Sequence, residues 1–324
     1  MQVLLDANKS FFKAQLHCHS KNSDGRLTVE KQKELFKQNG YSVVAFTDHE
    51  HLIDNSHLDD ESFLTITACE VAVKEFPNES TMKNHKMRVA HLNFYALDQH
   101  NTVTPCYNSV YDHFINDAIK DKIRFDGEYQ RSYSPEGINK MIKDAKKQGF
   151  LVSYNHPDWS LENACDYLKY QNLDFVEIYN HSCTVQGGEG YQIKVFDDML
   201  RSGKKIYATM CDDSHSEKDM FGGWVMINTE KLEYNSIMNA LKNGNFYSSQ
   251  GPEIYSIVLE DNVVTVKTSK AKRIALSTKG RRSQAKSGEN ITCASFKLKE
   301  TDGYFRITVI DKFNNRAHSQ SYEV

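Results

Sequence analysis

The stretch LHCHSKNSDG, residues 16–25, closes a short apolar run with two histidines on either side of a cysteine. Side chains alternate along a β-strand, so His17 and His19 are predicted to emerge on one face near the end of a strand. Asp24 follows in a Ser-Asp-Gly turn, which is an ordinary place for an acidic residue. The meaning of this stretch therefore depends on whether the rest of the chain supplies partners for the two histidines.

Further runs rich in β-branched and aromatic residues follow, and amphipathic stretches with helical spacing lie between several of them. The predicted strands are residues 13–19, 42–48, 63–72, 88–97, 150–156, 174–181 and 205–213. The predicted helices are residues 28–40, 108–121, 134–149, 160–170, 189–203 and 233–243. This alternation predicts an α/β fold with a parallel sheet, and seven strands favour closure into a TIM-like barrel. An open doubly wound sheet is the competing prediction, although no glycine-rich phosphate loop follows the first strand.

The character of the chain changes after GNFYSSQGPE, residues 244–253. The tail consists of short alternating runs separated by Asp-Asn, Gly and Lys-rich turns, which is typical of a small all-β, sandwich-like domain. We therefore predict two domains, a barrel over residues 1–250 and an all-β domain over residues 251–324. A structural cap over the barrel is the expected role of the second domain.

Composition narrows the class of protein. The chain has 324 residues, 39% of them hydrophobic, and a formal net charge of −3, so neither a nucleic-acid partner nor disorder is indicated. No apolar run approaches the roughly 20 residues that cross a bilayer, and the N-terminus lacks the basic region of a signal peptide. Seven cysteines without a CxxC motif predict free thiols, and we expect a cytoplasmic protein that does not bind membranes.

Histidine, aspartate or glutamate occurs near the end of nearly every predicted strand, and in a parallel barrel these ends meet at one mouth. Carboxylates buried together there would repel one another without a cation, and the imidazoles would lack partners. We therefore predict a polynuclear metal site. Its predicted ligands are His17, His19, Asp24, His49, Glu70, His91, His156, Asp213 and His215.

The ordered motifs HCH, SDG, TDH, a strand-end Glu, a strand-end His, NHP and DxH resemble the motif series of the PHP (polymerase and histidinol phosphatase) superfamily over residues 12 to about 250. The resemblance implies a distorted (β/α)7 barrel with up to three metal ions at its mouth. It implies a first ion on His17, His19, Glu70 and Asp213, a second on Glu70, His91 and His156, and a third on Asp24, His49 and His215. In having an aspartate at position 24, the chain resembles the nucleotide-phosphatase branch of the superfamily more than the histidinol phosphatase branch.

Mixed imidazole and carboxylate ligands suit Zn, Mn or Fe, so the predicted cofactors are two or three divalent ions. The predicted reaction is hydrolysis of a small-molecule phosphate mono- or diester, nucleotides included, by a metal-bound hydroxide. The predicted catalytic residues are His17, His19, Glu70, Asp213 and Asp48, with Asp48 expected to orient a metal-bound histidine. The predicted substrate contacts are Lys21, Asn22, Trp159, Asn180 and His181. The alternatives are a metallohydrolase of a non-phosphate ester or amide, and a glycan-targeted protein that uses the β domain.

Overall fold

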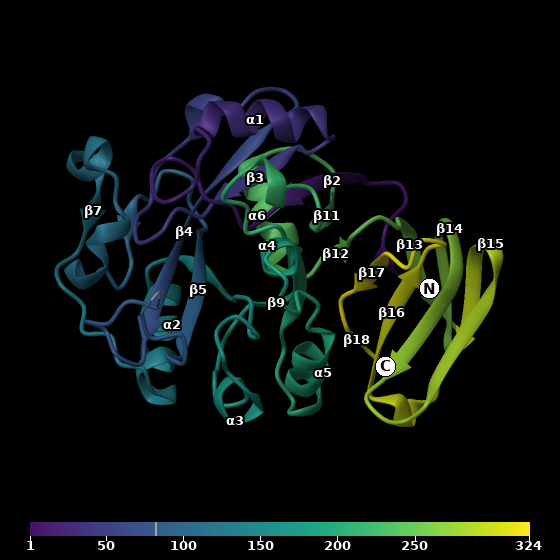
Figure 1. Ribbon diagram of the computed structural model, residues 1–324. Helices are drawn as coiled ribbons and strands as arrows, with labels where there is room; N and C mark the ends of the chain where they lie inside the picture. The colour runs from purple at the N-terminus through teal and green to yellow at the C-terminus, as the bar shows by residue number, and fades with distance from the viewer. Residues whose placement is uncertain (82) are drawn as a thin grey trace.

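The computed structural model describes residues 1–81 and 83–324, and it has a mixed α/β fold around one large sheet (Figure 1). The order of the strands in this sheet is β1-β13-β14-β16-β17-β12-β11-β2-β3-β4-β5-β8-β9-β10, with β15 beside β14 and β18 beside β16. The strands that carry the site are β2 Ser10–Gln15, β3 Val43–Phe46, β4 Leu64–Lys74, β5 Val89–Ala96, β8 Phe150–Tyr154, β9 Phe175–Asn180 and β10 Tyr207–Cys211. The other strands are β1 Gln2–Leu5, β6 Val103–Thr104, β7 Arg124–Phe125, β11 Trp224–Thr229, β12 Phe246–Ser249, β13 Ile254–Glu260, β14 Val263–Thr278, β15 Ser283–Lys297, β16 Tyr304–Ile310, β17 Arg316–Ser319 and β18 Tyr322–Glu323.

The seven site-bearing strands are those predicted from the sequence, but they are not all parallel. Strand β5 runs antiparallel to both of its neighbours, β4 and β8, whereas the other adjacent pairs among the seven are parallel. The prediction of a purely parallel sheet is therefore wrong. The physical reason lies in the connection: the described residues between β4 and β5, 75–81 and 83–88, form no helix, and a crossover between parallel strands is usually helical.

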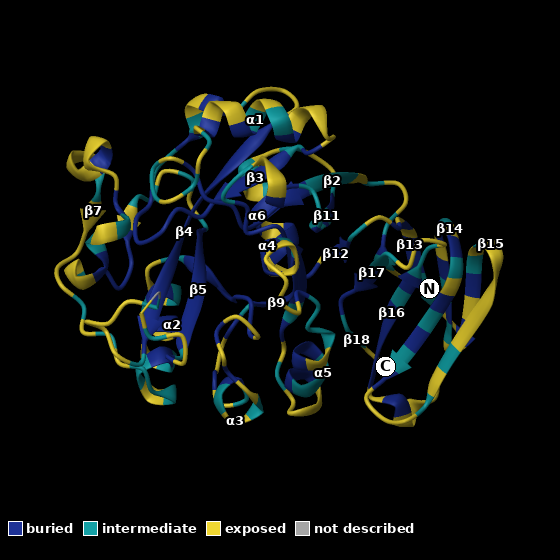
Figure 2. Cartoon of the chain, viewed as in Figure 1, coloured by how far each residue is buried: buried dark blue, intermediate teal, exposed yellow. Residues whose placement is uncertain are grey.

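The run of strands curls until the segments that follow its first and last members, β2 and β10, meet. Beyond the strand ends, Cys18 and Ser214 form a parallel bridge, and the Asp213 amide donates to the His17 carbonyl at 2.9 Å. Residues from these strands pack into one apolar cluster, and the central strands are buried along their length (Figure 2). The sheet thus brings the chain after β2 next to the chain after β10, which is the arrangement that the site requires.

Fewer helices cover the sheet than a regular (β/α) barrel would have. They are α1 Val29–Gln38, α2 Pro135–Lys147, α3 Ala164–Tyr167, α4 His181–Val185, α5 Ile193–Arg201 and α6 Tyr234–Lys242. Thr28 and Ser134 cap α1 and α2, since the side chain of each accepts a hydrogen bond from a backbone amide in the first turn of its helix. None of the helices in the described part of the chain is both long and apolar enough to span a membrane.

The helix predicted at residues 108–121 is instead two short 3-10 turns, Ser109–Phe114 and Asp117–Lys122. Asn108 and Asn116 each cap one of these turns with a side-chain oxygen, so the chain starts a new turn in the middle of the predicted helix. The correction matters for the site, because this segment supplies part of a cavity wall.

The C-terminal β-strands continue the same sheet rather than standing apart from it. Strand β12 pairs with β17, and the N-terminal strand β1 pairs with β13, a pairing that the sequence analysis did not anticipate. Strand β14, Val263–Thr278, is one continuous long strand rather than a set of short runs. The division of the chain at residue 250 and the sandwich form of its second part stay predictions.

The C-terminal segment also holds strand β10 through one buried glutamine. The Gln320 side chain accepts a hydrogen bond from the Ala208 amide at 2.7 Å and donates to the Ala208 carbonyl at 3.0 Å. The Gln320 side chain thereby pairs with the backbone N–H and C=O groups of Ala208, as the backbone of a neighbouring strand would. The C-terminal residues thus stabilise the strand that leads into Asp213.

Replacing Gln320 with alanine is expected to lower the free energy of unfolding by about 1–3 kcal/mol, because the buried Ala208 amide loses its acceptor. Urea unfolding followed by circular dichroism measures this change. The matched control is Gln38→Ala on the exposed end of α1, for which the change is expected to stay below about 0.5 kcal/mol. Equal effects of the two substitutions would refute the role given to Gln320.

Candidate metal centre

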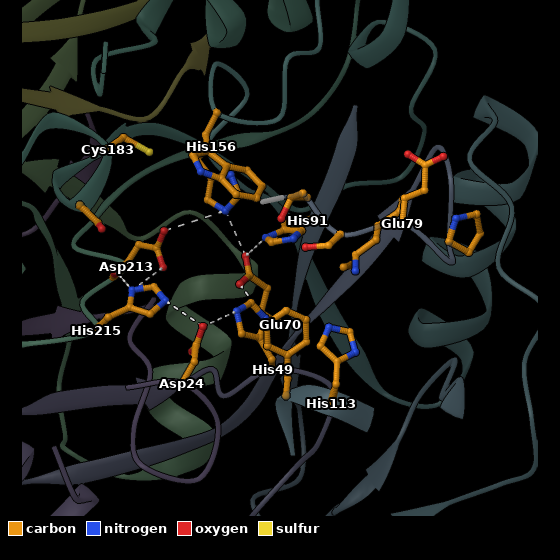
Figure 3. Close-up of a pocket in the computed structure, with 18 of the residues that line it drawn as sticks. Asp24, His49, Glu70, Glu79, His91, His113, His156, Cys183, Asp213 and His215 are labelled. Atoms are coloured by element: carbon orange, nitrogen blue, oxygen red, sulfur yellow. Dashed lines mark hydrogen bonds and ion pairs between the residues drawn. The ribbon is translucent and has the colours of Figure 1, made fainter. Parts of the chain in front are cut away.

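A cavity of about 820 Å³ opens where the ends of the site-bearing strands meet (Figure 3). Seven of the nine predicted ligands line it, namely Asp24, His49, Glu70, His91, His156, Asp213 and His215. The other two, His17 and His19, are fully buried and contact Glu70 and Asp213. The structure therefore brings all nine side chains together.

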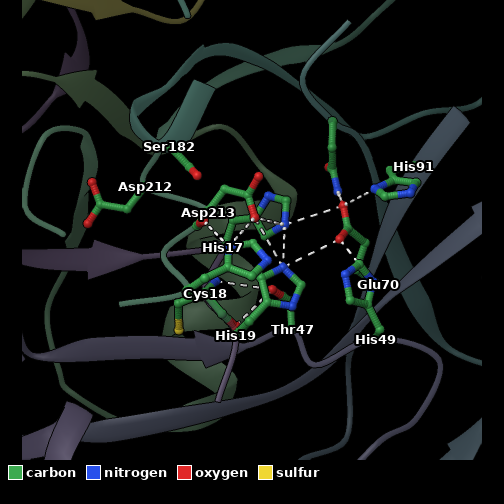
Figure 4. A network of polar contacts seen from close by, with 12 residues as sticks. His17, Cys18, His19, Thr47, His49, Glu70, His91, Ser182, Asp212 and Asp213 are labelled. Carbon is green, nitrogen blue, oxygen red and sulfur yellow. Dashed lines mark hydrogen bonds and ion pairs between the residues drawn. The ribbon is translucent and has the colours of Figure 1, made fainter. Parts of the chain in front are cut away.

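The first cluster contains His17, His19, Glu70 and Asp213 (Figure 4). The Nε2 atoms of the two histidines lie 3.3 Å apart, and the Asp213 Oδ1 atom lies 3.2 Å from His17 Nε2 and 3.1 Å from His19 Nε2. Asp213 also has a φ angle of +55°, a conformation that costs free energy for a residue with a Cβ atom. Such strain is typical of a residue that is held in place for its function.

The second cluster contains Glu70, His91 and His156. Glu70 Oε1 lies 3.1 Å from His91 Nδ1 and 3.1 Å from His156 Nε2. His91 lies near the start of β5 and not near its end, as a parallel strand would have required. It still reaches the shared mouth, because β5 is antiparallel and its start lies beside the far half of β4.

The third cluster contains Asp24, His49 and His215, and it also includes His19. Asp24 Oδ2 lies 3.5 Å from the Nε2 atoms of both His49 and His215. The Ser-Asp-Gly turn can approach because residue 25 is glycine: a Cβ atom there would lie 2.3 Å from the His19 carbonyl oxygen. The turn in the opening stretch is thus folded back onto the strand that carries the two histidines.

The donor atoms of these clusters suit divalent cations. Three of them are buried and lie near other ligand atoms, but make no hydrogen bond of acceptable geometry among the described residues: His19 Nδ1, His49 Nδ1 and Asp213 Oδ1. Buried polar atoms without partners are costly, and metal ligation is one way in which they are satisfied. Imidazole and carboxylate in this proportion suit Zn, Mn or Fe, and Glu70 has an oxygen in two of the clusters.

The protonation of the cluster supports the same interpretation. Burial opposes charge on His19, but Asp213, Glu70 and Asp24 raise its pKa to about 10. Burial likewise opposes charge on His17, whose pKa Asp213, Glu177 and Glu70 raise well above the usual range. Without metal, protons on these imidazoles balance the carboxylates, and divalent ions would replace those protons.

Glu177 is a buried residue of β9 that the sequence analysis did not select. Its Oε1 atom lies 2.5 Å from His17 Nδ1, and its Oε2 atom accepts a hydrogen bond from the His156 amide at 3.0 Å. A carboxylate on the rear nitrogen of a histidine fixes the ring and its tautomer for metal binding. The one available sequence signal was a glutamate inside the otherwise apolar strand DFVEIYNH.

Replacing Glu177 with glutamine is expected to weaken metal binding by about 10–100-fold, because His17 loses the carboxylate that orients its ring. Competition of the loaded protein with a chromophoric chelator measures the affinity. Glu162→Gln is the matched control: Glu162 is also buried, and its carboxylate accepts hydrogen bonds from Tyr133 and Tyr154. An equal loss of affinity in both variants would contradict the orienting role of Glu177.

Asp48 has a different role from the predicted one. Its carboxylate accepts hydrogen bonds from the Ser20 amide and hydroxyl, both at 2.7 Å, and from the Ser23 hydroxyl at 2.8 Å. Among the described residues it bonds to no histidine ring, so the prediction that it orients a metal-bound histidine is wrong. The loop that carries Asp24 folds back over the end of β3, and these hydrogen bonds to Asp48 hold it there.

The predicted substrate contacts divide into one that lines the cavity and four that do not. Trp159 lines the cavity, and its ring centroid lies 4.9 Å from that of His91. Asn180 instead donates hydrogen bonds to Asp213 at 3.1 Å and to Glu177 at 3.2 Å, so it positions charged groups. The other three, Lys21, Asn22 and His181, do not line the cavity either. Asn116 donates hydrogen bonds to the backbone carbonyls of Lys21 and Asn22. The His181 ring is hydrogen-bonded to the Tyr179 hydroxyl.

Comparison with protein-family models gave no match, and comparison with curated proteins gave none either. Among solved structures, a two-domain protein from Bacteroides vulgatus that contains a predicted PHP-like metal-dependent phosphoesterase aligns over 99% of this chain and 96% of its own, with 13% identity and a TM-score of 0.49. A proposed metal-dependent phosphoesterase from Bifidobacterium adolescentis aligns over 63% of this chain and 88% of its own, with 15% identity and a TM-score of 0.35.

An amidohydrolase from Chromobacterium violaceum, with bound sulfate and no metal, aligns over 63% of this chain and 88% of its own, with 15% identity and a TM-score of 0.36. Similarities of this size carry no argument about activity. The case for a function therefore rests on the geometry of the site.

Proposed function

We propose that this chain is a metal-dependent phosphoesterase of the PHP superfamily that hydrolyses a phosphate ester of a small molecule. One observation carries the proposal: three clusters of metal-ligand side chains adjoin a cavity of about 820 Å³. The first cluster shares Glu70 with the second and His19 with the third. We further propose that the curled sheet is the distorted seven-stranded barrel of that superfamily, and that Zn, Mn or Fe occupies two or three sites.

The chain's own residues would hold and orient the reactants. Bound divalent ions would supply Lewis-acid chemistry, which lowers the pKa of a water and neutralises phosphate charge. Glu70 offers Oε1 beside His17, His91 and His156, and Oε2 beside His19 and His49, so this carboxylate would contribute to two of the proposed ion sites. Glu177 fixes the His17 ring, and Asn180 fixes the Asp213 carboxylate.

The cavity can also desolvate an organic group of the substrate. The Trp159 ring packs beside His91 and His156, and the Phe114 ring packs beside His49 with the ring centroids 4.5 Å apart. Two aromatic faces therefore flank the predicted ligands at the cavity wall. Water exclusion by such walls strengthens the electrostatic interactions of a phosphoryl group with the site.

An activity panel tests the proposal. Protein stripped of metal is reloaded with Mn, Zn or Fe and assayed with an aryl phosphate monoester, an aryl phosphodiester and an aryl acetate. Turnover of a phosphate ester that requires metal and disappears in His17→Ala is the expected result. Turnover of the acetate alone would refute the phosphoesterase proposal and favour a metallohydrolase of carbon esters.

A further inference from the structure

Lys74 is a buried cation at the end of β4, and the site described above makes no use of it. It lies on the same face of the strand as Glu70 and Ala72, and all three line the cavity. Only 6% of Lys74 is exposed. Among the described residues that line the cavity, no other is a lysine or an arginine. Lysines are rarely buried so deeply unless they are paired.

The acidic residues near Lys74 do not neutralise it. Within the described ranges, no carboxylate oxygen lies within 4.0 Å of its ammonium group, and the ammonium donates no hydrogen bond. Glu50 faces this region, but Arg131 binds both of its oxygens, at 2.6 and 3.0 Å. Glu79 also lines the cavity, and its carboxylate accepts a hydrogen bond from Asn84. The ammonium instead lies near the Tyr111 and Phe114 rings, 5.2 and 5.8 Å from their centroids. Its charge has no anionic partner among the described residues and is therefore available to an anionic ligand.

The surroundings of Lys74 indicate what kind of ligand would reach it. Lys74 lies four positions along the strand from Glu70, a Cα separation of about 13 Å, so an anion at Lys74 lies away from Glu70. The cavity lining also includes the apolar side chains of Ala72, Val110, Phe114 and Trp159, and the Phe114 ring lies near both the Lys74 ammonium and His49. The loop after Lys74 adds the polar side chains of Asn78, Ser80 and Thr81 to the same lining.

We propose that Lys74 binds a second anionic group of the substrate, so that the natural substrate is an organic phosphate that carries a carboxylate or another phosphate beyond an apolar spacer. The inference rests on the proposed phosphoesterase function and deepens it. The metal ligands would take one phosphate, the aromatic walls would pack on the spacer, and the Lys74 ammonium would pair with the second anion. Charge-assisted hydrogen bonds in a desolvated cavity are among the stronger polar contacts.

A binding experiment tests the role of Lys74 separately from catalysis. The probes are phenylphosphonate and 4-carboxyphenylphosphonate, which cannot be hydrolysed, titrated calorimetrically into the Mn-loaded protein. Wild type is expected to bind the carboxylated probe at least about tenfold more tightly, because only that probe reaches Lys74. This preference is expected to disappear in Lys74→Met and to persist in Lys74→Arg. Lys31→Met, on the exposed face of α1, is the control and should retain the preference.

Equal affinity of wild type for the two phosphonates would overturn the inference, and so would an unchanged preference in Lys74→Met. The same proteins are then assayed with phenyl phosphate and 4-carboxyphenyl phosphate. A binding preference that depends on Lys74 together with no turnover would sustain the anion site and sink the phosphoesterase proposal. Turnover without a binding preference for the carboxylated probe would support the phosphoesterase proposal and refute the anion site at Lys74. The failure of one proposal can therefore be told from the failure of the other.

Discussion

Replacing Glu70 with glutamine is expected to lower kcat/KM for an aryl phosphate by about 10³-fold or more. Glu70 is 1% exposed, and its two oxygens lie within 3.4 Å of five histidines. The amide keeps the size of the side chain but removes the negative charge and one acceptor. Steady-state kinetics with the Mn-loaded protein measures the loss.

The substitution must also be shown to act through metal binding. Bound metal per chain, measured by elemental analysis, is expected to fall in Glu70→Gln, because Glu70 belongs to two of the three clusters. Glu34→Gln, on the exposed face of α1, should change neither metal content nor kcat/KM. Full activity with full metal content in Glu70→Gln would contradict the role proposed for this carboxylate in metal binding.

Removing the metal is expected to abolish activity and to destabilise the fold by about 3–4 kcal/mol relative to protein held at 100–1,000 times the dissociation constant of the ion. The loss arises because bound ions stabilise only the folded chain. Thermal unfolding with and without a chelator measures the shift in Tm. Identical Tm values in the two conditions would contradict a metal centre that is coupled to folding.

The stability of the metal-free protein is further expected to depend on pH, with a sign that the pKa values determine. The raised pKa values of His17 and His19 contribute stability that is complete below pH 6.5 and is lost as the pH rises through the folded pKa, about 10 for His19. The carboxylates of Asp24, Glu70 and Asp213 have lowered pKa values, so they stay ionised in this window. Metal-free protein should therefore lose stability between pH 6.5 and 10.

Metal-loaded protein should lose less stability over the same interval, because divalent ions take the place of the imidazole protons. Metal binding near pH 7 should then release protons. Calorimetric titration of the metal in buffers of different ionisation enthalpy counts the protons released. Binding without proton release would contradict the raised pKa values.

The ligand set could be predicted from the sequence because its residues cluster at strand ends. His17 and His19, two residues apart, share a face whatever the exact bounds of the strand, and Asp213 and His215 repeat that spacing. The structure groups all nine predicted ligands and adds only His19 to the third cluster. Strand periodicity thus carried most of the information about the site.

The errors arose where tertiary contacts decide the outcome. The direction of β5 goes with a connection after β4 that forms no helix among its described residues, which strand periodicity does not reveal. The hydrogen bonds of Asp48 to Ser20 depend on how the loop folds back at Gly25, and the position of Lys21 depends on Asn116, far along the chain. Glu177 escaped notice because a single glutamate in a strand has no pattern that reveals its partner.

The number of metal ions bound per chain tests the central claim most directly. Protein stripped with a chelator, reloaded with Mn, freed of excess metal and subjected to elemental analysis should hold two to three ions per chain. Glu70→Gln should hold fewer, and Glu34→Gln should match wild type. Less than one ion per chain in wild type, under conditions in which the protein is folded, would contradict a polynuclear centre at these nine residues.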